Sequence, residues 1–209
     1  AVEALGFEEP TSIQAQSIPL IMSGKDVIGH SQTGTGKTAA FSIPAIEKID
    51  QSCKAVQVLI LCPTRELAIQ ACDEIKKFTK FKSGIKAVPI FGGQQITRQI
   101  TALRQGAQIV VGTPGRVMDH MRRKTLKLDN LNMVVLDEAD EMLSMGFRED
   151  IETILKDVTL PHQTILFSAT LSPAIMQITK QYQTDPEIIK ITRKEITVPN
   201  IEQLYYEVP

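Results

Sequence analysis

Short apolar runs alternate along the chain with longer segments in which apolar residues recur at a helical period. Runs such as Val58–Leu61 and Val134–Leu136 are apolar throughout, as expected for strands that helices cover on both faces. The pattern predicts strands at Asp26–Gly29, Val56–Leu61, Ala87–Phe91, Ile109–Val111, Met133–Leu136, Thr164–Phe167 and Ile188–Ile191. It predicts helices at Ser12–Met22, Lys37–Ile49, Glu66–Phe78, Ile96–Arg104, Arg116–Arg123, Ile151–Val158 and Pro173–Tyr182.

This alternation predicts the α/β fold class, with a doubly wound parallel sheet and helices on both faces. A length of 209 residues fits one large domain, or at most one domain and part of another. In such sheets ligands bind at the carboxyl ends of the strands. We therefore expect the functional residues to come directly after the apolar runs.

The segment Ser31–Thr38 follows the first predicted strand and precedes a helix, which is the context of a phosphate-binding loop. It matches G-x-x-x-x-G-K-[ST] except that Ser31 replaces the first glycine. Gly34 and Gly36 allow the backbone to wrap closely around a phosphate. Lys37 is expected to reach the β- and γ-phosphates and Thr38 to bind Mg²⁺. A glycine-rich turn with a chance lysine is the less favoured alternative, because strand, glycines, lysine and helix coincide.

Two carboxylates, Asp137 and Glu138, come directly after the strand Met133–Leu136. We expect Asp137 to hold Mg²⁺ through water and Glu138 to orient or deprotonate the attacking water. Taken alone, the pair is explained equally well as the acidic start of a helix. Together with Lys37 and Thr38, it favours a nucleotide triphosphatase.

Three other predicted strands are followed by residues suited to phosphate. Thr64 and Arg65 follow the second strand, Gly92-Gly93 the third, and Thr113 and Arg116 the fourth. Helix caps explain each threonine singly, and the glycine pair is as consistent with a plain turn. Jointly they predict a second phosphate-binding surface, separate from the nucleotide site. Because no aromatic cluster accompanies them, we expect contact with a nucleic acid backbone rather than base stacking.

Two further segments have both a structural and a functional interpretation. Ser172 and Pro173 are explained as a helix cap and first residue, which leaves Ser168 and Thr170 free to bond the acidic loop and report its state. Gln14 lies in the first turn of the first helix. It is suited to the donor–acceptor edge of adenine, although a glutamine in a capping region is the safer interpretation.

Bulk composition restricts the function only weakly. The chain is 43% hydrophobic and 22% charged with a net charge of -1, so it has no overall basic field for nucleic acid. Three cysteines without C-x-x-C spacing are typical of reduced thiols in an intracellular protein. We find no membrane-spanning run and no signal peptide, and we expect a cytoplasmic protein. A targeting segment that has been removed stays possible.

In their order, these segments resemble the DEAD-box ATP-dependent RNA helicases over essentially the entire chain. The resemblance rests on Gly6–Gln14, Ser31–Thr38, Pro63–Ala68, Gly92-Gly93, Thr113–Arg116, Asp137–Asp140 and Ser168–Thr170. It implies that residues 1–209 form the amino-terminal RecA-like, P-loop NTPase domain, with ATP and Mg²⁺ as cofactors. Serine at position 31, in place of the first glycine of the general phosphate-loop pattern, also resembles this family, which commonly has Ala or Ser there.

The resemblance also implies a role for each matching residue. Phe7 would stack on adenine and Gln14 would read its edge, and the nucleotide would further contact Gln32, Thr33, Gly34, Thr35, Gly36, Lys37 and Thr38. Thr38 and Asp137 would serve the metal, and Lys37, Asp137 and Glu138 catalysis. The path of the RNA backbone would be lined by Pro63, Thr64, Arg65, Gly93, Thr113, Gly115 and Arg116. Contacts of this kind imply little sequence specificity. Asp140, Ser168 and Thr170 would couple the two sites, whereas Glu9 departs from the basic residue common in relatives.

No His-Arg-x-Gly-Arg-like segment follows Ser168–Thr170, and Asn200–Tyr206 resembles the entry into an interdomain linker. The aromatic residue that the family usually has further upstream is also missing. We therefore expect that the second RecA-like domain is absent from this chain and that the isolated domain is nearly inactive. The segments Leu126–Asp129 and Asp140–Phe147 look more similar to bacterial members.

Two rival functions remain open. One is a DNA helicase or another P-loop ATPase, against which Gln14 and Asp137–Asp140 argue. The other is a non-catalytic, nucleotide-gated RNA clamp or scaffold, which ranks second because Lys37, Thr38, Asp137 and Glu138 are all present.

Overall fold

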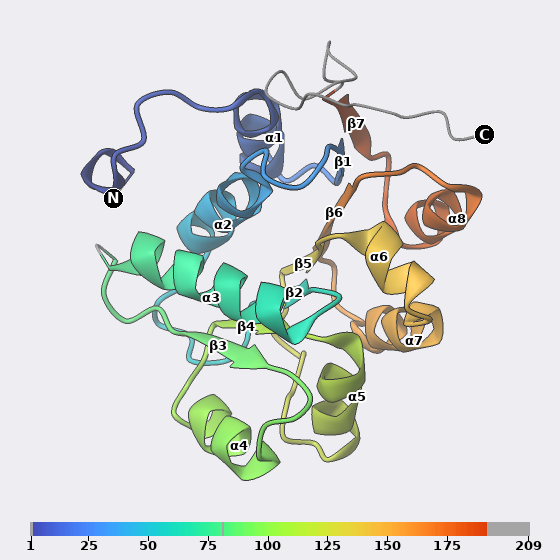
Figure 1. Cartoon of the computed structure of the whole chain (residues 1–209). Coiled ribbons are helices and arrows are strands. Elements are labelled where there is room, and N and C mark those ends of the chain that lie inside the picture. Colours follow the sequence, from blue (N-terminus) through green and yellow to red (C-terminus); the bar gives the residue numbers. More distant parts are fainter. Residues whose placement is uncertain (1, 81, 192–209) are drawn as a thin grey trace, which may run out of the picture.

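The computed structural model describes residues 2–80 and 82–191, which form one parallel sheet between two layers of helices (Figure 1). The segment Asn200–Tyr206, interpreted above as a linker entry, lies outside the described residues. The strands are β1 (Val27–His30), β2 (Val58–Leu61), β3 (Ala87–Ile90), β4 (Ile109–Gly112), β5 (Met133–Leu136), β6 (Gln163–Ser168) and β7 (Glu187–Lys190). The helices are η1 (Glu3–Leu5), α1 (Ser12–Met22), α2 (Lys37–Glu47), α3 (Arg65–Thr79), α4 (Ile96–Arg104), α5 (Pro114–Arg122), α6 (Ala139–Ser144), α7 (Arg148–Asp157) and α8 (Pro173–Tyr182).

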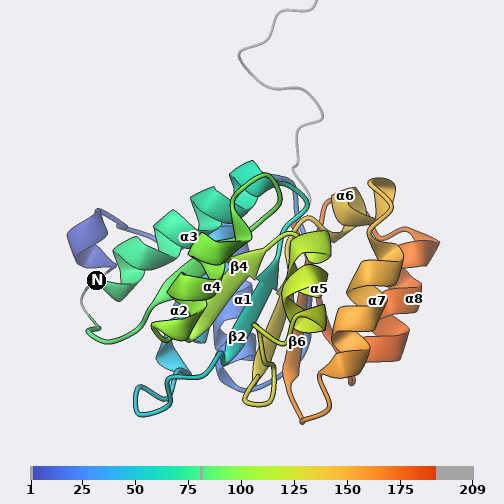
Figure 2. The same cartoon turned by 90° about the horizontal axis from the view of Figure 1, so that it is seen from below.

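The sheet buries both of its faces. Alternate residues of each strand point to opposite sides, so Val58 and Ile60 of β2 pack with α1, α2 and α3, whereas Leu59 and Leu61 pack with the helices of the other face. In Figure 1 helices α1 to α3 lie on one side of the strands and α5 to α8 on the other. Figure 2, seen from below, shows α5 beside α7 on the second face. The uninterrupted apolar strands are thus explained by burial on both sides.

The strand order is β3-β4-β2-β5-β6-β1-β7, and every pair is parallel. All carboxyl ends of the strands therefore meet at one edge of the sheet. The ends of β3, β4 and β2 are neighbours, and the ends of β5, β6 and β1 follow them in that order. This order places the two groups of residues that sequence analysis singled out on adjacent halves of one edge.

The predicted elements are confirmed, with ends shifted by a few residues. Sequence analysis missed η1 and α6, because helices of three and six residues are too short to show a period. It also began α5 and α7 two and three residues late, at Arg116 and Ile151 instead of Pro114 and Arg148. The three cysteines are free, and Cys62 and Cys72 are buried. Within residues 2–80 and 82–191, no helix has the length and apolarity needed to cross a membrane.

An aromatic ring from β6 fills the space over a glycine of β1. A Cβ atom added to Gly29 would lie 2.2 Å from the ring of Phe167, and that ring in turn packs against Phe41 of α2 at 5.9 Å between centroids. Gly29 and Phe167 are paired in register across the two strands. The strand that precedes the glycine turn and the strand that ends at Ser168 are therefore packed without a gap.

Candidate nucleotide site and candidate RNA surface

The glycine turn Ser31–Gly36 adopts the backbone that its sequence requires. Gly34 and Gly36 have φ angles of 77° and 92°, in the left-handed region that side chains with a Cβ rarely adopt. Helix α2 begins directly afterwards at Lys37, so its free N–H groups face the turn. The Thr35 hydroxyl donates back to the Gln32 carbonyl oxygen at 2.9 Å, which tightens the loop.

One cavity of about 590 Å³ lies between this turn, the acidic segment after β5 and helix α3. Of the residues that sequence analysis assigned to the nucleotide, it is lined by Phe7, Gln14, Thr33, Gly34, Gly36, Lys37, Thr38, Asp137 and Glu138. Lys37 and Asp137 thus share one cavity although a hundred positions separate them. Gln32 and Thr35 are not among the lining residues. A volume of this size is in the range of small-molecule and cofactor sites.

Lys37 is held in the cavity by Glu138. The Lys37 Nζ atom donates to Glu138 Oε1 at 2.6 Å, and a weaker contact reaches the Ser31 carbonyl oxygen at 3.5 Å. Both side chains are nearly buried, with 5% and 10% of their surface exposed. A buried charge is stable only when it is paired, so the lysine and the glutamate compensate each other.

Asp137 is a buried carboxyl group with little compensation. Its pKa is raised from 3.8 to about 6, mainly by burial and to a smaller degree by the Glu138 charge, while Lys37 and the Glu138 N–H oppose the change. That N–H donates to Asp137 Oδ1 at 3.1 Å. A carboxylate in such a place gains from any additional positive charge that enters the cavity.

The backbone of Glu138 is strained. Its φ and ψ are both 51°, a left-handed conformation that is costly for a residue with a Cβ, by about 1 kcal/mol or more. Glu138 is also the N-cap of α6. The sharp turn lets two successive carboxylates, Asp137 and Glu138, line the same cavity.

The donor set of the cavity fits a magnesium ion carried by phosphates. Among the described residues no cluster of three or more histidine, cysteine, aspartate or glutamate side chains exists that could hold a metal unaided. Mg²⁺ in proteins is usually bound through one or two carboxylates plus substrate phosphates and water, all of them oxygen ligands. Asp137 and the hydroxyl of Thr38 line the same cavity and are ligands of this kind.

Gln14 and Phe7 also line the cavity. Gln14 Oε1 accepts from the Thr11 N–H at 3.1 Å, and its Nε2 donates to the Gly36 carbonyl oxygen at 3.1 Å. The helix-capping interpretation of Gln14 is therefore confirmed, and the same side chain ties α1 to the glycine turn. The ring of Phe7, 38% exposed, packs against Phe78 of α3 at 5.9 Å.

The second group of predicted residues gathers at the ends of β3, β4 and β2. Thr64 caps α3 by accepting from the Leu67 N–H at 3.3 Å, as expected. Arg65 is more than half exposed, and its guanidinium lies 5.6 Å from the centre of the Phe91 ring. Gly93 has a φ angle of 81°, and a Cβ atom added to it would lie 3.7 Å from Nη1 of the same guanidinium.

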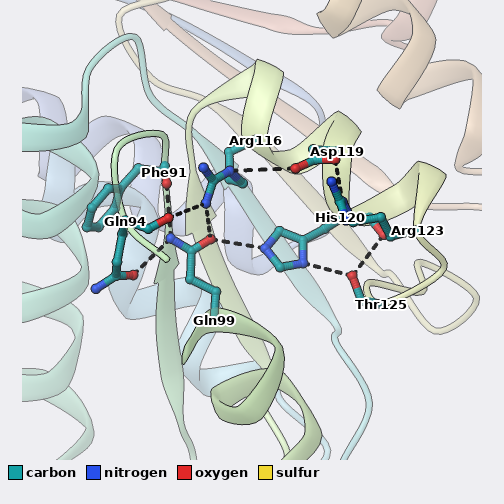
Figure 3. Close-up of polar contacts among 8 residues, drawn as sticks. All are labelled: Phe91, Gln94, Gln99, Arg116, Asp119, His120, Arg123 and Thr125. Atoms are coloured by element: carbon teal, nitrogen blue, oxygen red, sulfur yellow. Dashed lines mark hydrogen bonds and ion pairs between the residues drawn. The ribbon is translucent and has the colours of Figure 1, made fainter. Parts of the chain in front are cut away.

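Arg116 differs from Arg65 in its surroundings. Its side chain is only 16% exposed, and its Nη1 donates to the Gln94 carbonyl oxygen at 3.0 Å and to Gln99 Oε1 at 3.2 Å (Figure 3). Thr113 is the N-cap of α5, as the sequence predicts, although its side chain makes no capping hydrogen bond; Pro114 is the first residue of the helix and Gly115 is exposed. The two arginines thus border the same strand ends: Arg65 is more than half exposed and packs against Phe91, whereas Arg116 is hydrogen-bonded to the protein.

Ser168 and Thr170 connect to the acidic segment differently from our expectation. The Ser168 hydroxyl donates to the Thr170 carbonyl oxygen at 2.7 Å, which closes a local turn. The contact with the acidic segment is made by the backbone instead, because the Ala169 N–H points to Asp140 Oδ1 at 3.4 Å. The Ser168 hydroxyl turns inward on its own loop because Ser168 is fully buried at the end of β6, whereas Thr170 is exposed.

Sequence analysis missed several residues of these sites. Glu74 and Gln70 of α3 line the nucleotide cavity, and Gln99 and His120 are buried beside Arg116. A helix period reveals which face is buried but not what an isolated polar residue on that face contacts. The only signal in the sequence for the second pair was a glutamine and a histidine on the buried faces of two helices, and neither residue belongs to a recognisable motif.

Comparison with known proteins relates this geometry to a family. The model of the DEAD/DEAH box helicase family matches residues 11–178. The DEAD-box ATP-dependent RNA helicase CshA of Bacillus cereus (strain ATCC 10987 / NRS 248) is 55% identical over 208 residues, and that of Bacillus subtilis (strain 168) is also 55% identical. The matches cover the whole of this chain but only 39% and 42% of these relatives. The chain thus spans about two fifths of the length of the curated relatives it matches.

Solved structures give the same relationship. The DEAD box protein of the hyperthermophile Methanococcus jannaschii superimposes with a TM-score of 0.86 at 45% identity, over 90% of this chain and 52% of that one. The yeast DEAD-box splicing factor Prp28 superimposes with a TM-score of 0.88 at 34% identity, over 95% of this chain and 49% of that one.

Proposed function

The chain belongs to the DEAD/DEAH box helicase family, and from that premise we propose that it is the ATP-binding, amino-terminal RecA-like domain of an ATP-dependent RNA helicase. The observation that carries the proposal is the single cavity shared by the glycine turn, Lys37, Asp137 and Glu138. The relatives, of which this chain spans about two fifths, support a second RecA-like domain in the full-length protein.

In this proposal the cavity binds a nucleoside triphosphate along its length. The backbone N–H groups of the glycine turn and the start of α2 face the phosphates, and Lys37 neutralises their charge. Thr38 and Asp137 hold Mg²⁺, which supplies charge stabilisation at the phosphates when it is bound. Gln14 reads the edge of adenine with its remaining donor and acceptor, and Phe7 stacks on the base.

Glu138 changes partner during the cycle. In the structure its carboxylate is occupied by Lys37 at 2.6 Å. A phosphate that binds Lys37 competes with this contact and releases the carboxylate. The released group is then within the cavity to accept the proton of the attacking water.

RNA lies along the neighbouring half of the sheet edge. Arg65 and Arg116, the hydroxyls of Thr64 and Thr113, and the backbone at Gly93 and Gly115 offer contacts to sugar and phosphate. Pro63 lies directly before Thr64, between the end of β2 and the start of α3. Such contacts read little sequence, which suits a protein that acts on RNA of varied sequence.

Within the nucleotide half of the edge, coupling runs through the end of β6, because β6 lies between β5, which leads into the acidic segment, and β1, which leads into the glycine turn. The Ser31 N–H donates to the Ser168 carbonyl oxygen at 3.1 Å, and the Ala169 N–H faces Asp140. The segment Ser168–Thr170 therefore touches both the glycine turn and the acidic segment. In the proposed mechanism it transmits the state of the phosphates to the residues around Asp140.

The deciding experiment uses the full-length protein. ATP turnover is measured with single-stranded RNA and with single-stranded DNA of the same sequence, and the separation of a short RNA duplex is followed in parallel. We expect stimulation by RNA alone and ATP-dependent separation of the duplex. Equal stimulation by DNA would favour a DNA helicase, and ATP-dependent retention of RNA without turnover would favour a clamp.

A further inference from the structure

Helices α4 and α5 carry two buried polar side chains that the proposed nucleotide and RNA contacts do not use. Gln99 is 2% exposed and His120 is completely buried. Both lie beside Arg116 and near the loop that begins at Phe91 (Figure 3). Polar groups are costly to bury, so their partners determine what they do.

Every hydrogen-bonding position of the Gln99 amide is used. Its Nε2 donates to the Phe91 carbonyl oxygen at 3.0 Å and to Gln94 Oε1 at 2.8 Å. Its Oε1 accepts from Arg116 Nη1 at 3.2 Å and lies 3.0 Å from His120 Nε2. Two donors and two acceptors are the full capacity of this side chain. Gln99 thus joins three elements: the loop after β3, helix α4 and helix α5.

These partners fix the orientation of the amide and the tautomer of the histidine. A carbonyl oxygen can only accept and a guanidinium can only donate, so Nε2 must face Phe91 and Oε1 must face Arg116. His120 Nε2 must then carry a hydrogen and donate to Oε1. Its other nitrogen, Nδ1, lies 2.8 Å from the Thr125 hydroxyl, which supports the ring from the far side.

The groups held by this network border the candidate RNA surface. Arg116 is bound at one atom to both Gln99 and the Gln94 carbonyl oxygen, and Asp119 approaches its Nε at 3.9 Å. The Phe91–Gln94 loop contains Gly92 and Gly93, both exposed, and its Phe91 ring supports Arg65. A guanidinium fixed in advance loses less conformational freedom when it meets a phosphate.

We propose that Gln99 and His120 are positioning residues that hold Arg116 and the Phe91–Gln94 loop in the arrangement that binds the RNA backbone. This inference rests on the proposed RNA-binding function and extends it to two residues that make no RNA contact themselves. Gln99 acts on both partners, through its amide oxygen on Arg116 and through its amide nitrogen on the loop. His120 acts by fixing the orientation of Gln99.

The test measures the affinity of the full-length protein for a fluorescent oligouridylate by anisotropy, with ATP affinity and melting temperature as parallel readouts. Gln99→Met keeps the length of the side chain and removes all four contacts. We expect about tenfold weaker RNA binding, the effect of one charge-assisted hydrogen bond, without a matching loss of ATP affinity. A purely structural role would lower the melting temperature and leave RNA affinity unchanged in the folded protein.

Conservative variants separate the two halves of the network. Gln99→Glu keeps acceptors for Arg116 and His120 but cannot donate to Phe91 and Gln94, so it isolates the contribution of the loop. His120→Gln can keep a donor toward Gln99, whereas His120→Leu cannot. We expect His120→Gln to bind RNA better than His120→Leu, and this pair serves as the test if Gln99→Met does not fold.

A double-mutant cycle decides whether Gln99 acts through Arg116. In an Arg116→Ala background, Gln99→Met should weaken RNA binding by clearly less than it does alone. Full additivity, or wild-type RNA affinity of Gln99→Met, overturns the inference. If the wild-type protein itself does not bind single-stranded RNA, the proposed function fails and takes this inference with it, so the two failures are distinguishable.

Discussion

The buried contact between Lys37 and Glu138 predicts that one substitution changes nucleotide affinity and turnover in opposite directions. Glu138→Gln keeps an oxygen at the position of Oε1 but removes the charge that faces Lys37 at 2.6 Å. Lys37 then has a weaker partner within the protein and is more available to a phosphate. Turnover should fall, because an amide cannot accept the proton of the attacking water.

The size of the affinity change follows from the nature of the bond. A hydrogen bond between charged groups contributes about 1.5–3 kcal/mol and one with a neutral partner about 0.5–1.5 kcal/mol. With both side chains at most 10% exposed, solvent screens this difference little. A difference of about 1.4 kcal/mol is a factor of ten, so we expect ATP to bind about tenfold more tightly. Loss of a general base lowers turnover by about 10²–10⁴.

Binding of a fluorescent ATP analogue and RNA-stimulated phosphate release, both in the full-length protein, measure the two effects. Glu74→Gln is the matched control, since Glu74 lines the same cavity and carries the same charge but is not paired with Lys37. Its gain in affinity should be clearly smaller. The reasoning is refuted if Glu138→Gln binds ATP no more tightly than the wild type, or if its turnover is unchanged.

Three further predictions concern the isolated chain and two buried ionisable groups. The 209-residue chain alone should bind adenine nucleotide weakly, and RNA should not accelerate its slow hydrolysis, since an arginine finger from a second domain contributes about 10³–10⁵ in rate; strong stimulation in a phosphate-release assay would contradict this. Burial raises the pKa of Asp137 from 3.8 to about 6, so its contribution to stability is present below pH 3.8 and lost as the pH rises through about 6. Asp137→Asn should therefore raise the free energy of unfolding above pH 6 by about 2–3 kcal/mol, measured in urea, whereas an unchanged midpoint would reject the burial argument. Burial, Arg116 and Arg123 lower the pKa of His120 against the opposing effect of Asp119, so the wild type should lose stability as the pH falls below 6.5, and His120→Gln should lose less over the same range.

The fold could be predicted from the sequence because its strands are buried on both faces. Val58–Leu61 and Met133–Leu136 have no polar interruption, and each is followed at once by residues with evident chemistry. A parallel sheet brings these strand ends to one edge, so neighbouring residues such as Lys37 and Asp137 could be inferred without coordinates. The short helix α6 could not, because six residues do not define a period.

Side-chain partners were less predictable than positions. The sequence suggested that the hydroxyls of Ser168 and Thr170 reach the acidic segment, but the Ala169 N–H does so instead. Likewise, Lys37 forms a hydrogen bond with Glu138, whereas it acts on Asp137 only through the electrostatic attraction between their charges. Such choices depend on differences of an ångström in a packed interior, which motif spacing does not encode.

The close contact between Gly29 and Phe167 restricts how relatives of this protein can diverge. Any residue larger than glycine at position 29 would collide with the aromatic ring, which is completely buried and itself packs against Phe41. A change at position 29 is therefore tolerable only with a smaller residue at position 167. Because these two positions lead into the glycine turn and into Ser168, they are expected to covary as a pair, and introducing alanine at position 29 alone would displace both functional loops together.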